Sequence, residues 1–237
     1  MIQVSFHGAM AVVGCSSVLV DTGTEKIVLD YGTKIQEMPP LFPIPVQGKI
    51  DAILLSHSHL DHSGAVPVLE AEKNGAPVYT PNVTKQLAEL LWLDSIKISR
   101  EEKVELPFDK NDVRKTLSNF VPTNFRKPFS LKKTKVTLFD AGHIPGSTMH
   151  FLDTGEKKIL YTGDYKIAPT RLMKGADTNL PDVDVLITES TYCDREHPDR
   201  KSQEKELVRT VRSTLANDGI ALISGFAVGR IDELLLV

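Results

Sequence analysis

The order of apolar and polar positions predicts short strands at the start of the chain and mixed strands and helices after them. Up to residue 60, short apolar stretches alternate with Asp-Thr-Gly and Tyr-Gly turns, as expected of a sheet. From Asp61 the apolar positions take helical spacing, and this stretch ends near Asn74 and Gly75, a typical left-handed stop. The other predicted helices are 83–98 and 112–120, and the predicted strands are 2–6, 17–20, 27–30, 52–56, 77–80, 136–139, 148–152, 158–161 and 183–188.

A change of pattern around residues 198–202 predicts a second unit. A helix over 202–216, a strand over 220–224 and a helix that opens near Val228 alternate as in an α/β domain. We therefore expect a core domain over residues 1–200 and the incomplete start of another domain over 201–237. The apolar helical pattern at 232–237 has no capping signal, which predicts that the chain is cut rather than finished.

Composition narrows the class of protein only slightly. The 237 residues are 41% hydrophobic and 25% charged, as in an ordinary globular protein, and the net charge is −3. A polyanionic partner would therefore have to be held by local basic residues or by metal. Cys15 and Cys193 form no spaced pair, so neither a disulfide framework nor a thiolate zinc site is indicated. Without a stretch of ~18 apolar residues, a cytoplasmic protein outside the membrane is expected.

A dense group of metal-ligand side chains follows the predicted strand 52–56. His57 and His59 are two residues apart, so in extended backbone both imidazoles point to one side and can share one ion. Asp61 and His62, where the helix starts, can then face a second ion. A surface histidine cluster or a histidine-aromatic core patch is the alternative, which the density of the group disfavours. Two adjacent divalent cations are the first hypothesis.

Further ligand-type side chains follow later strands. His143 and Asp164 each stand beside glycine after a predicted strand, and a carboxylate can bridge two cations with its two oxygens. Asp30 is a candidate acceptor that fixes the tautomer of an imidazole, although an ordinary turn-forming aspartate is an equal alternative. His7 and His150 lie in strand surroundings, where packing is the favoured role, and His197 is left unassigned.

Taken together, Asp30, the His57-x-His59-x-Asp61-His62 run, His143 and Asp164 resemble the metallo-β-lactamase superfamily in order and context. Within it, residues 60–67, 188–192 and 226–230 are similar to the β-CASP nucleases, the branch that contains ribonuclease J and the polyadenylation cleavage factor. The likeness is greatest to archaeal cleavage-factor-like members without an N-terminal KH extension. It covers essentially the whole chain.

The resemblance implies a fold and an assignment of ligands. The fold is an α/β four-layer αββα sandwich followed by the beginning of a β-CASP domain. His57, His59 and His143 would hold one Zn²⁺ ion, Asp61 and His62 the other, and Asp164 would bridge them. Glu189 matches an acidic residue that in the family pairs with a histidine near the leaving group. That histidine and the last zinc-ligating histidine belong to motifs beyond Val237.

The predicted function is zinc-dependent hydrolysis of RNA. Two cations roughly 3.5–4 Å apart lower the pKa of a shared water and neutralise charge on a phosphodiester. Asp61 would orient that water, so Asp61, Glu189 and Asp30 are the catalytic candidates. A local segment with aromatic residues, Phe125 and Phe129, is basic at Arg126, Lys127, Lys132, Lys133 and Lys135, and it could bind along an RNA backbone. A solvated loop is the favoured interpretation.

Two other function classes are open at this point. The same ligand set serves acyl substrates, so a thioesterase or lactonase is the second hypothesis, and residues 189–192 and 226–230 argue against it. A non-catalytic scaffold within an RNA-processing complex is the third, and the retained ligands disfavour it. Internal or 5′-terminal cleavage, RNA preference, and assembly as a homodimer or in a larger complex are not decided by the sequence.

Overall fold

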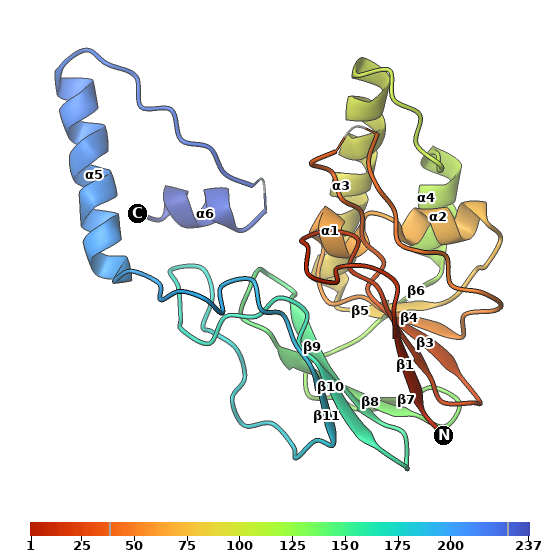
Figure 1. Cartoon of the computed structure of the whole chain (residues 1–237). Coiled ribbons are helices and arrows are strands. Elements are labelled where there is room, and N and C mark those ends of the chain that lie inside the picture. The colour runs from red at the N-terminus through yellow and green to blue at the C-terminus, as the bar shows by residue number, and fades with distance from the viewer. Residues whose placement is uncertain (38, 227) are drawn as a thin grey trace.

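Two β-sheets packed face to face form the centre of the molecule (Figure 1). The computed structural model describes residues 1–37, 39–226 and 228–237. Within these residues, one sheet has six strands in the order β1-β2-β3-β4-β5-β6, and the other has five in the order β11-β10-β9-β8-β7. The strands of the first sheet are β1 (Gln3–Phe6), β2 (Val18–Asp21), β3 (Lys26–Leu29), β4 (Ala52–Leu54), β5 (Val78–Thr80) and β6 (Phe120–Pro122). Those of the second are β7 (Phe129–Ser130), β8 (Lys135–Asp140), β9 (Thr148–Asp153), β10 (Lys158–Tyr161) and β11 (Val185–Ile187).

The middle strands of the first sheet run parallel, which places their carboxyl ends at one edge. β3, β4, β5 and β6 pair in parallel, whereas β1, β2 and β3 are antiparallel. Apart from Lys26 at the start of β3, the residues of β3 and β4 are apolar and buried, as parallel strands between two layers must be. Asp30 and the His57–His62 run follow these two strands directly, so both meet at the same edge.

Helices cover the outer face of the first sheet. They are α1 (Leu60–Ser63), α2 (Val66–Ala71), α3 (Asn82–Glu101) and α4 (Lys110–Ser118). α3 buries Thr84, Ala88, Trp92 and Ile96, a spacing that keeps one face of the helix against the sheet. Trp92 is fully buried and its indole Nε1 donates to the Ser63 carbonyl at 3.1 Å. The indole therefore supports α1 from behind, directly beneath the histidine run.

The predicted α/β class and the core of two packed sheets are confirmed. A buried apolar cluster that includes Ile27, Leu54, Leu138 and Leu152 joins the two sheets. On the outer face of the second sheet, Phe139, Met149 and Phe151 are covered by Tyr165, Ala176 and Leu180. In the described part of the chain, this fourth layer is thus an irregular segment rather than a helix.

The last residues form an arm that extends beyond the two sheets (Figure 1). It consists of α5 (Arg200–Ala216) and α6 (Arg230–Leu235), and α5 has no buried residue. The predicted strand over 220–224 is wrong: these residues are irregular, and Ile220 and Leu222 are 91% and 96% exposed. A strand needs a hydrogen-bonded neighbour, and the described residues offer none here. The domain boundary near residues 198–202 stays a prediction.

Three other expectations differ from the structure. The helix expected from Asp61 is divided into α1 and α2, because Pro67 lacks the N–H that a continuous helix would use. The helix expected over 112–120 begins earlier, because the Asp109 side chain caps it by accepting from the N–H groups of Asn111 and Asp112. Phe120 instead starts β6, which the pattern did not predict, and neither did it predict β7. No helix in the described ranges has the length and apolar character to cross a membrane.

Candidate metal centre

Three segments bring ligand-type side chains together at the carboxyl edge of the first sheet. His57 and His59 lie in the turn between β4 and α1, and His62 lies within α1. His143 comes from the loop between β8 and β9, and Asp164 follows β10. Two sets of three residues have ligand atoms within 4.8 Å of one another: His57, His59 and His143, and His57, His62 and Asp164.

The ring nitrogens of the first set lie close to one another. His57 Nε2 and His143 Nε2 lie 3.1 and 3.2 Å from His59 Nδ1. Ser56 Oγ donates to Asp30, so it accepts from His57 Nδ1, which carries the proton of that ring. His59 Nε2 faces the Val228 carbonyl oxygen at 3.2 Å and must donate to it, which leaves Nδ1 bare. His57 Nε2 and His59 Nδ1 are then both unprotonated, and two lone pairs this close repel unless a cation lies between them, so the set fits a divalent metal.

The second set adds carboxylates. His62 Nε2 lies 3.3 Å from Asp164 Oδ1 and 3.8 Å from Asp61 Oδ2. The other oxygen of Asp164, Oδ2, lies 3.7 Å from His143 Nε2. Each Asp164 oxygen therefore faces a different imidazole, an arrangement suited to a carboxylate shared by two cations. Asp61 lies at the rim, with 27% of its side chain exposed.

Asp30 is the anchor behind both sets. It is fully buried and adopts a left-handed φ of 59°. Oδ1 accepts from the Ser56 N–H at 2.7 Å, and Oδ2 accepts from Ser56 Oγ at 2.7 Å, His62 Nδ1 at 2.6 Å and the Tyr161 hydroxyl at 2.6 Å. His62 is thus turned so that Nε2 faces Asp164, and His57 is oriented through Ser56. The sequence identified Asp30 as such an acceptor, but not Ser56 and Tyr161.

The backbone of the Asp61–His62 turn is held from the other side. The N–H groups of Ser16 and Tyr31 donate to the carbonyls of Asp61 and His62 at 2.9 and 2.8 Å. Gly32 is required here, since a Cβ at this position would lie 1.7 Å from the Asp61 carbonyl oxygen. Asp61 therefore projects from a turn that cannot easily move.

Burial and charge set the protonation of the centre in opposite directions. Burial lowers the pKa of His57 well below its ordinary value and that of His143 to about 4, so both rings are neutral. Burial also acts to lower the pKa of His62, but the Asp164 and Asp30 carboxylates outweigh it and raise that pKa well above 6.5. Burial would raise the pKa of Asp164, yet His62, His57 and His143 hold it well below its usual range. A cation on the second set therefore replaces a proton on His62.

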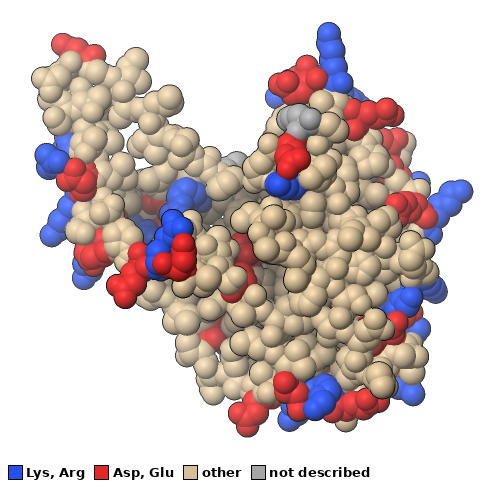
Figure 2. All heavy atoms as spheres, viewed as in Figure 1, with Lys and Arg blue, Asp and Glu red and all other residues tan. Residues whose placement is uncertain are grey.

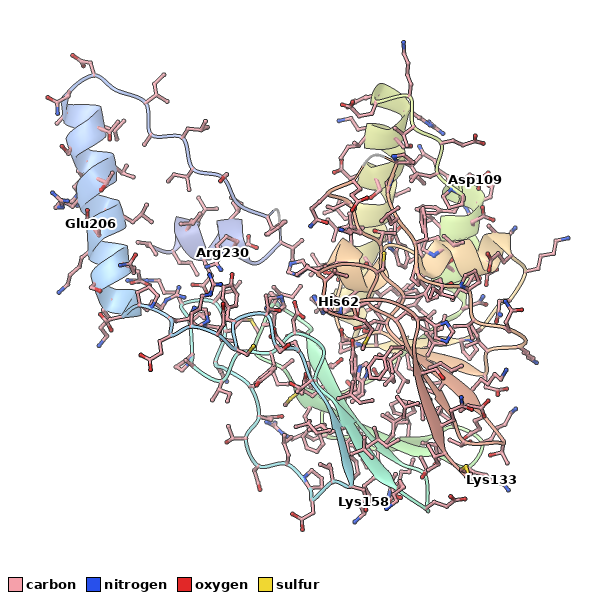
Figure 3. All side chains as sticks on the ribbon, viewed as in Figure 1. His62, Asp109, Lys133, Lys158, Glu206 and Arg230 are labelled. Carbon is pink, nitrogen blue, oxygen red and sulfur yellow. The ribbon has the colours of Figure 1, made fainter. Side chains whose placement is uncertain are left out.

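Other predicted residues lie at different distances from the centre. Glu189 accepts from the N–H groups of Tyr165 and Thr191, both at 3.3 Å, and so lies beside the Asp164 loop. The basic segment is not brought to the centre: Lys132 pairs with Asp51 at 2.6 Å, and Lys133 lies at the opposite end of the sandwich from His62 (Figure 3). The segment 226–230 includes Ala227, which is outside the described residues, but Val228 reaches the centre.

Fold and site together define an α/β protein with a candidate divalent-metal site at the carboxyl edge of its first sheet. The chain belongs to the metallo-β-lactamase superfamily: residues 12–190 match the metallo-beta-lactamase superfamily domain. Over 90% of its length it is also similar to a crystal structure of a protein of unknown function from Enterococcus faecalis, covering 58% of that chain, with a TM-score of 0.56 and 17% identity.

Among relatives, the chain is similar to "Probable RNase MJ4" of Methanocaldococcus jannaschii, with 40% identity over 99% of this chain and 56% of the relative. It is also similar to "RNase aCSPSF2" of Saccharolobus solfataricus, with 34% identity over 95% of this chain and 46% of the relative. The chain thus spans about half the length of these relatives. Their similarity supports placement in the β-CASP nuclease branch.

His150 lies on β9 behind the centre. Because of this residue, we expect the free energy of unfolding to fall in acid. His150 is fully buried, with Nε2 2.9 Å from Thr148 Oγ1, and burial lowers its pKa to about 4. Because the unfolded imidazole titrates near 6.5, the unfolded state binds more protons between these values, and stability falls as the pH drops through that window.

The expected loss from His150 is about 2 kcal/mol between pH 7.5 and pH 5, measured by urea unfolding of the metal-free protein. In His150→Gln the other histidines still titrate, so this variant should lose about 2 kcal/mol less than the wild type over the same interval. Only the pH difference is compared, so any uniform destabilisation by the substitution cancels. Equal losses in the two proteins would contradict the assignment.

Proposed function

We propose that this protein is a metal-dependent ribonuclease that hydrolyses RNA phosphodiester bonds with two Zn²⁺ ions. The observation that carries the proposal is the convergence of imidazole nitrogens around a carboxylate that has one oxygen toward each side. We assign His57, His59 and His143 to one ion, Asp61 and His62 to the other, and Asp164 to both. Imidazole and carboxylate ligands of this number suit zinc.

In this mechanism, the bound ions would lower the pKa of a water and neutralise charge on the phosphodiester, so the protein need not supply a nucleophile. The side chains of the protein orient the attacking water and the metal-binding imidazoles. Asp61, fixed by the turn around it, is placed to accept a proton from the attacking water at its exposed carboxylate. Asp30 keeps the His62 and His57 rings aligned, and Glu189, beside the Asp164 loop, is proposed to act on the leaving-group side.

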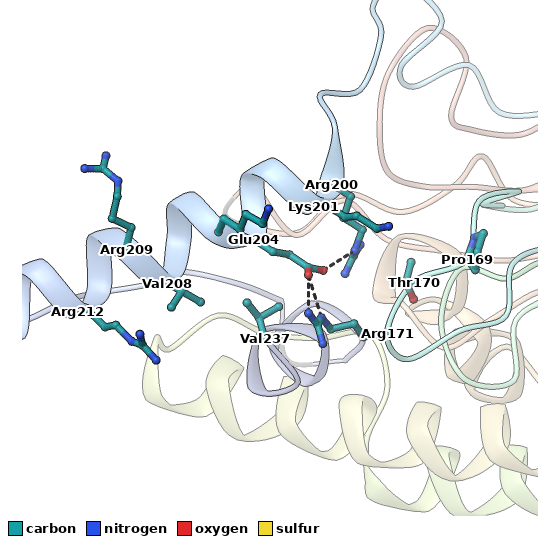
Figure 4. Close-up of a pocket in the computed structure, with 11 residues that line it drawn as sticks. Pro169, Thr170, Arg171, Arg200, Lys201, Glu204, Val208, Arg209, Arg212 and Val237 are labelled. Atoms are coloured by element: carbon teal, nitrogen blue, oxygen red, sulfur yellow. Dashed lines mark hydrogen bonds and ion pairs between the residues drawn. The ribbon is translucent and has the colours of Figure 1, made fainter.

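A basic cavity beside the arm supports RNA as the substrate. It has a volume of about 780 Å³ and lies between α5 and residues 169–171 (Figure 4). Six of its lining residues are basic: Arg171, Arg200, Lys201, Lys205, Arg209 and Arg212. Glu204 is engaged by Arg171 and Arg200, while Lys201, Lys205 and Arg212 have no ion pair within the described residues. Figure 2 shows basic side chains at the base of α5, interspersed with acidic ones, beside the hollow between the arm and the body.

The names of the two archaeal relatives, each an RNase, further support an RNA substrate. Free cations along the arm suit a substrate with phosphates repeated along its length better than a neutral acyl substrate. Together with residues 189–192 and 226–230, the basic cavity therefore favours RNA over an acyl substrate.

The test compares RNA and acyl substrates with the same preparations of the intact protein. We expect zinc-dependent RNA cleavage that chelation abolishes and zinc restores. Asp61→Ala and His62→Ala should each lower it by at least about 100-fold, because each is assigned to the reacting centre. Asp153→Ala, at the end of β9 where the side chain accepts from the Gly155 N–H of the following turn, is the control and should cleave normally. Unchanged cleavage in both centre variants, or thioester turnover without RNA cleavage, would overturn the proposal.

A further inference from the structure

One contact joins the arm to the metal centre. The carbonyl oxygen of Val228, in the segment that leads into α6, lies 3.2 Å from His59 Nε2. The two residues are 169 positions apart in the sequence. Val228 is 8% exposed, and the Phe226 ring lies 6.3 Å from the His59 ring, centroid to centroid. The segment is therefore packed against this imidazole rather than passing by it.

The contact determines which nitrogen of His59 is bare. A carbonyl oxygen only accepts, so His59 Nε2 must carry the proton, and Nδ1 presents its lone pair to His57 Nε2 and His143 Nε2. Without this acceptor, both tautomers and a rotated ring become accessible. Acceptors behind metal-binding imidazoles typically change metal affinity by 10–100-fold when they are lost. His57 and His62 have such partners in Ser56 and Asp30, whereas Val228 serves His59.

Gly229 allows the carbonyl to reach this position. Its φ is 84°, and a Cβ built there would lie 2.5 Å from Ile144 Cγ2. Ile144 is 2% exposed and follows His143 in the chain, so it has no open space to move into. A side chain at position 229 would therefore push the segment away from the centre or displace the His143 loop.

The first turn of α6 is clamped to the body by Glu233. Its carboxylate accepts from the N–H groups of Leu172 at 2.6 Å and Arg171 at 3.3 Å, and it pairs with Arg200 at the start of α5. Glu233 is 8% exposed, and its own N–H donates to the Gly229 carbonyl at 3.0 Å. The charged clamp, the glycine and the Val228 carbonyl thus form one continuous connection to His59.

We propose that the Val228 carbonyl, placed by Gly229 and Glu233, is a positioning group of the metal centre. Through it, docking of the arm orients His59 and raises the zinc affinity of the set formed by His57, His59 and His143. The inference rests on the proposed function only in that His59 binds a metal. It makes the arm part of the centre in addition to any contact that it makes with RNA.

The test measures zinc affinity by chelator competition in the intact protein. Gly229→Ala should weaken the binding of one ion by about 10–100-fold. Its Co²⁺-loaded form should show an altered visible spectrum, because the spectrum reports the geometry around the ion and a purely structural role would not change it. Gly155→Ala is the matched control: Gly155 also has a positive φ, 80°, but a Cβ there meets nothing within 4 Å. It should bind zinc as the wild type does.

Two further variants make the result decisive. Ile144→Leu removes the Cγ2 branch, so combined with Gly229→Ala it should restore zinc affinity to within a few-fold of Gly155→Ala. Glu233→Gln removes the ion pair with Arg200 without altering a residue of the metal centre, and it should weaken the binding of the same zinc ion. This variant decides the question if Gly229→Ala does not fold. Wild-type zinc affinity in both Gly229→Ala and Glu233→Gln overturns the inference. Normal zinc loading without RNA cleavage in the wild type refutes only the proposed ribonuclease function.

Discussion

Replacing Asp164 by asparagine is expected to lower RNA cleavage by at least about 100-fold and to leave about one tightly bound zinc instead of the two proposed for the wild type. The side chain keeps its size but loses its charge. In the protein, one Asp164 oxygen lies 3.3 Å from His62 Nε2 and the other 3.7 Å from His143 Nε2, so the two sets share this single carboxylate. An amide offers one oxygen and a donor, and a donor repels a cation.

Zinc content after dialysis and the rate of RNA cleavage are the two measurements for Asp164→Asn. Asp184→Asn is the control, because Asp184 is 40% exposed, pairs with Lys157 and accepts from the N–H of Lys158, which lies at the far end of the sandwich from His62 (Figure 3). We expect this control to keep two zinc ions and full activity. Two tightly bound ions in Asp164→Asn would show that the carboxylate is not shared.

Replacing Asp30 by asparagine is expected to destabilise the fold by about 3 kcal/mol and to weaken zinc binding by about 10–100-fold. Asparagine tolerates the left-handed φ of 59° at this position, so the backbone is not the cause. The cause is the polar network. The carboxylate accepts from Ser56, His62 and Tyr161 in a fully buried site, and an amide would set its N–H₂ group against these donors.

Tyr161→Phe provides the graded comparison for Asp30→Asn. It removes one of the donors to Asp30 and leaves the carboxylate, so a loss of about 1 kcal/mol and a smaller change in zinc affinity are expected. Urea unfolding of the metal-free protein and chelator competition measure the two effects separately. If Asp30→Asn lost stability without any loss of zinc affinity, its role in orienting the imidazoles would be refuted.

The histidine run is the part of the candidate centre that local sequence predicts well. In extended backbone, side chains two residues apart lie on the same face, and the structure places His57 Nε2 and His59 Nδ1 3.1 Å apart. Asp30 was also named as a candidate acceptor, because it is a carboxylate at the end of an apolar strand pattern, although an ordinary turn-forming aspartate was an equal alternative. These inferences needed only backbone geometry over a few residues.

Other features depended on the arrangement of distant segments. The helix after Asp61 was predicted as one element because apolar spacing is insensitive to the missing N–H of Pro67. The strand over 220–224 was predicted because its residues favour extended backbone, yet a strand also needs a partner, and no periodicity reveals whether one is present. In the sequence, Tyr161 resembles an ordinary buried strand residue, whereas in the structure its hydroxyl donates to Asp30.

The sequence by itself therefore determined the α/β class and supplied the candidate metal ligands and the candidate acceptor Asp30, because these follow from short-range periodicity and the chemistry of single side chains. Only the tertiary structure decided which oxygen of Asp164 faces which imidazole, that Tyr161 and Ser56 share Asp30, and that Val228 lies behind His59. These contacts join residues up to 169 positions apart, and their geometry is set by how sheets, loops and arm pack together.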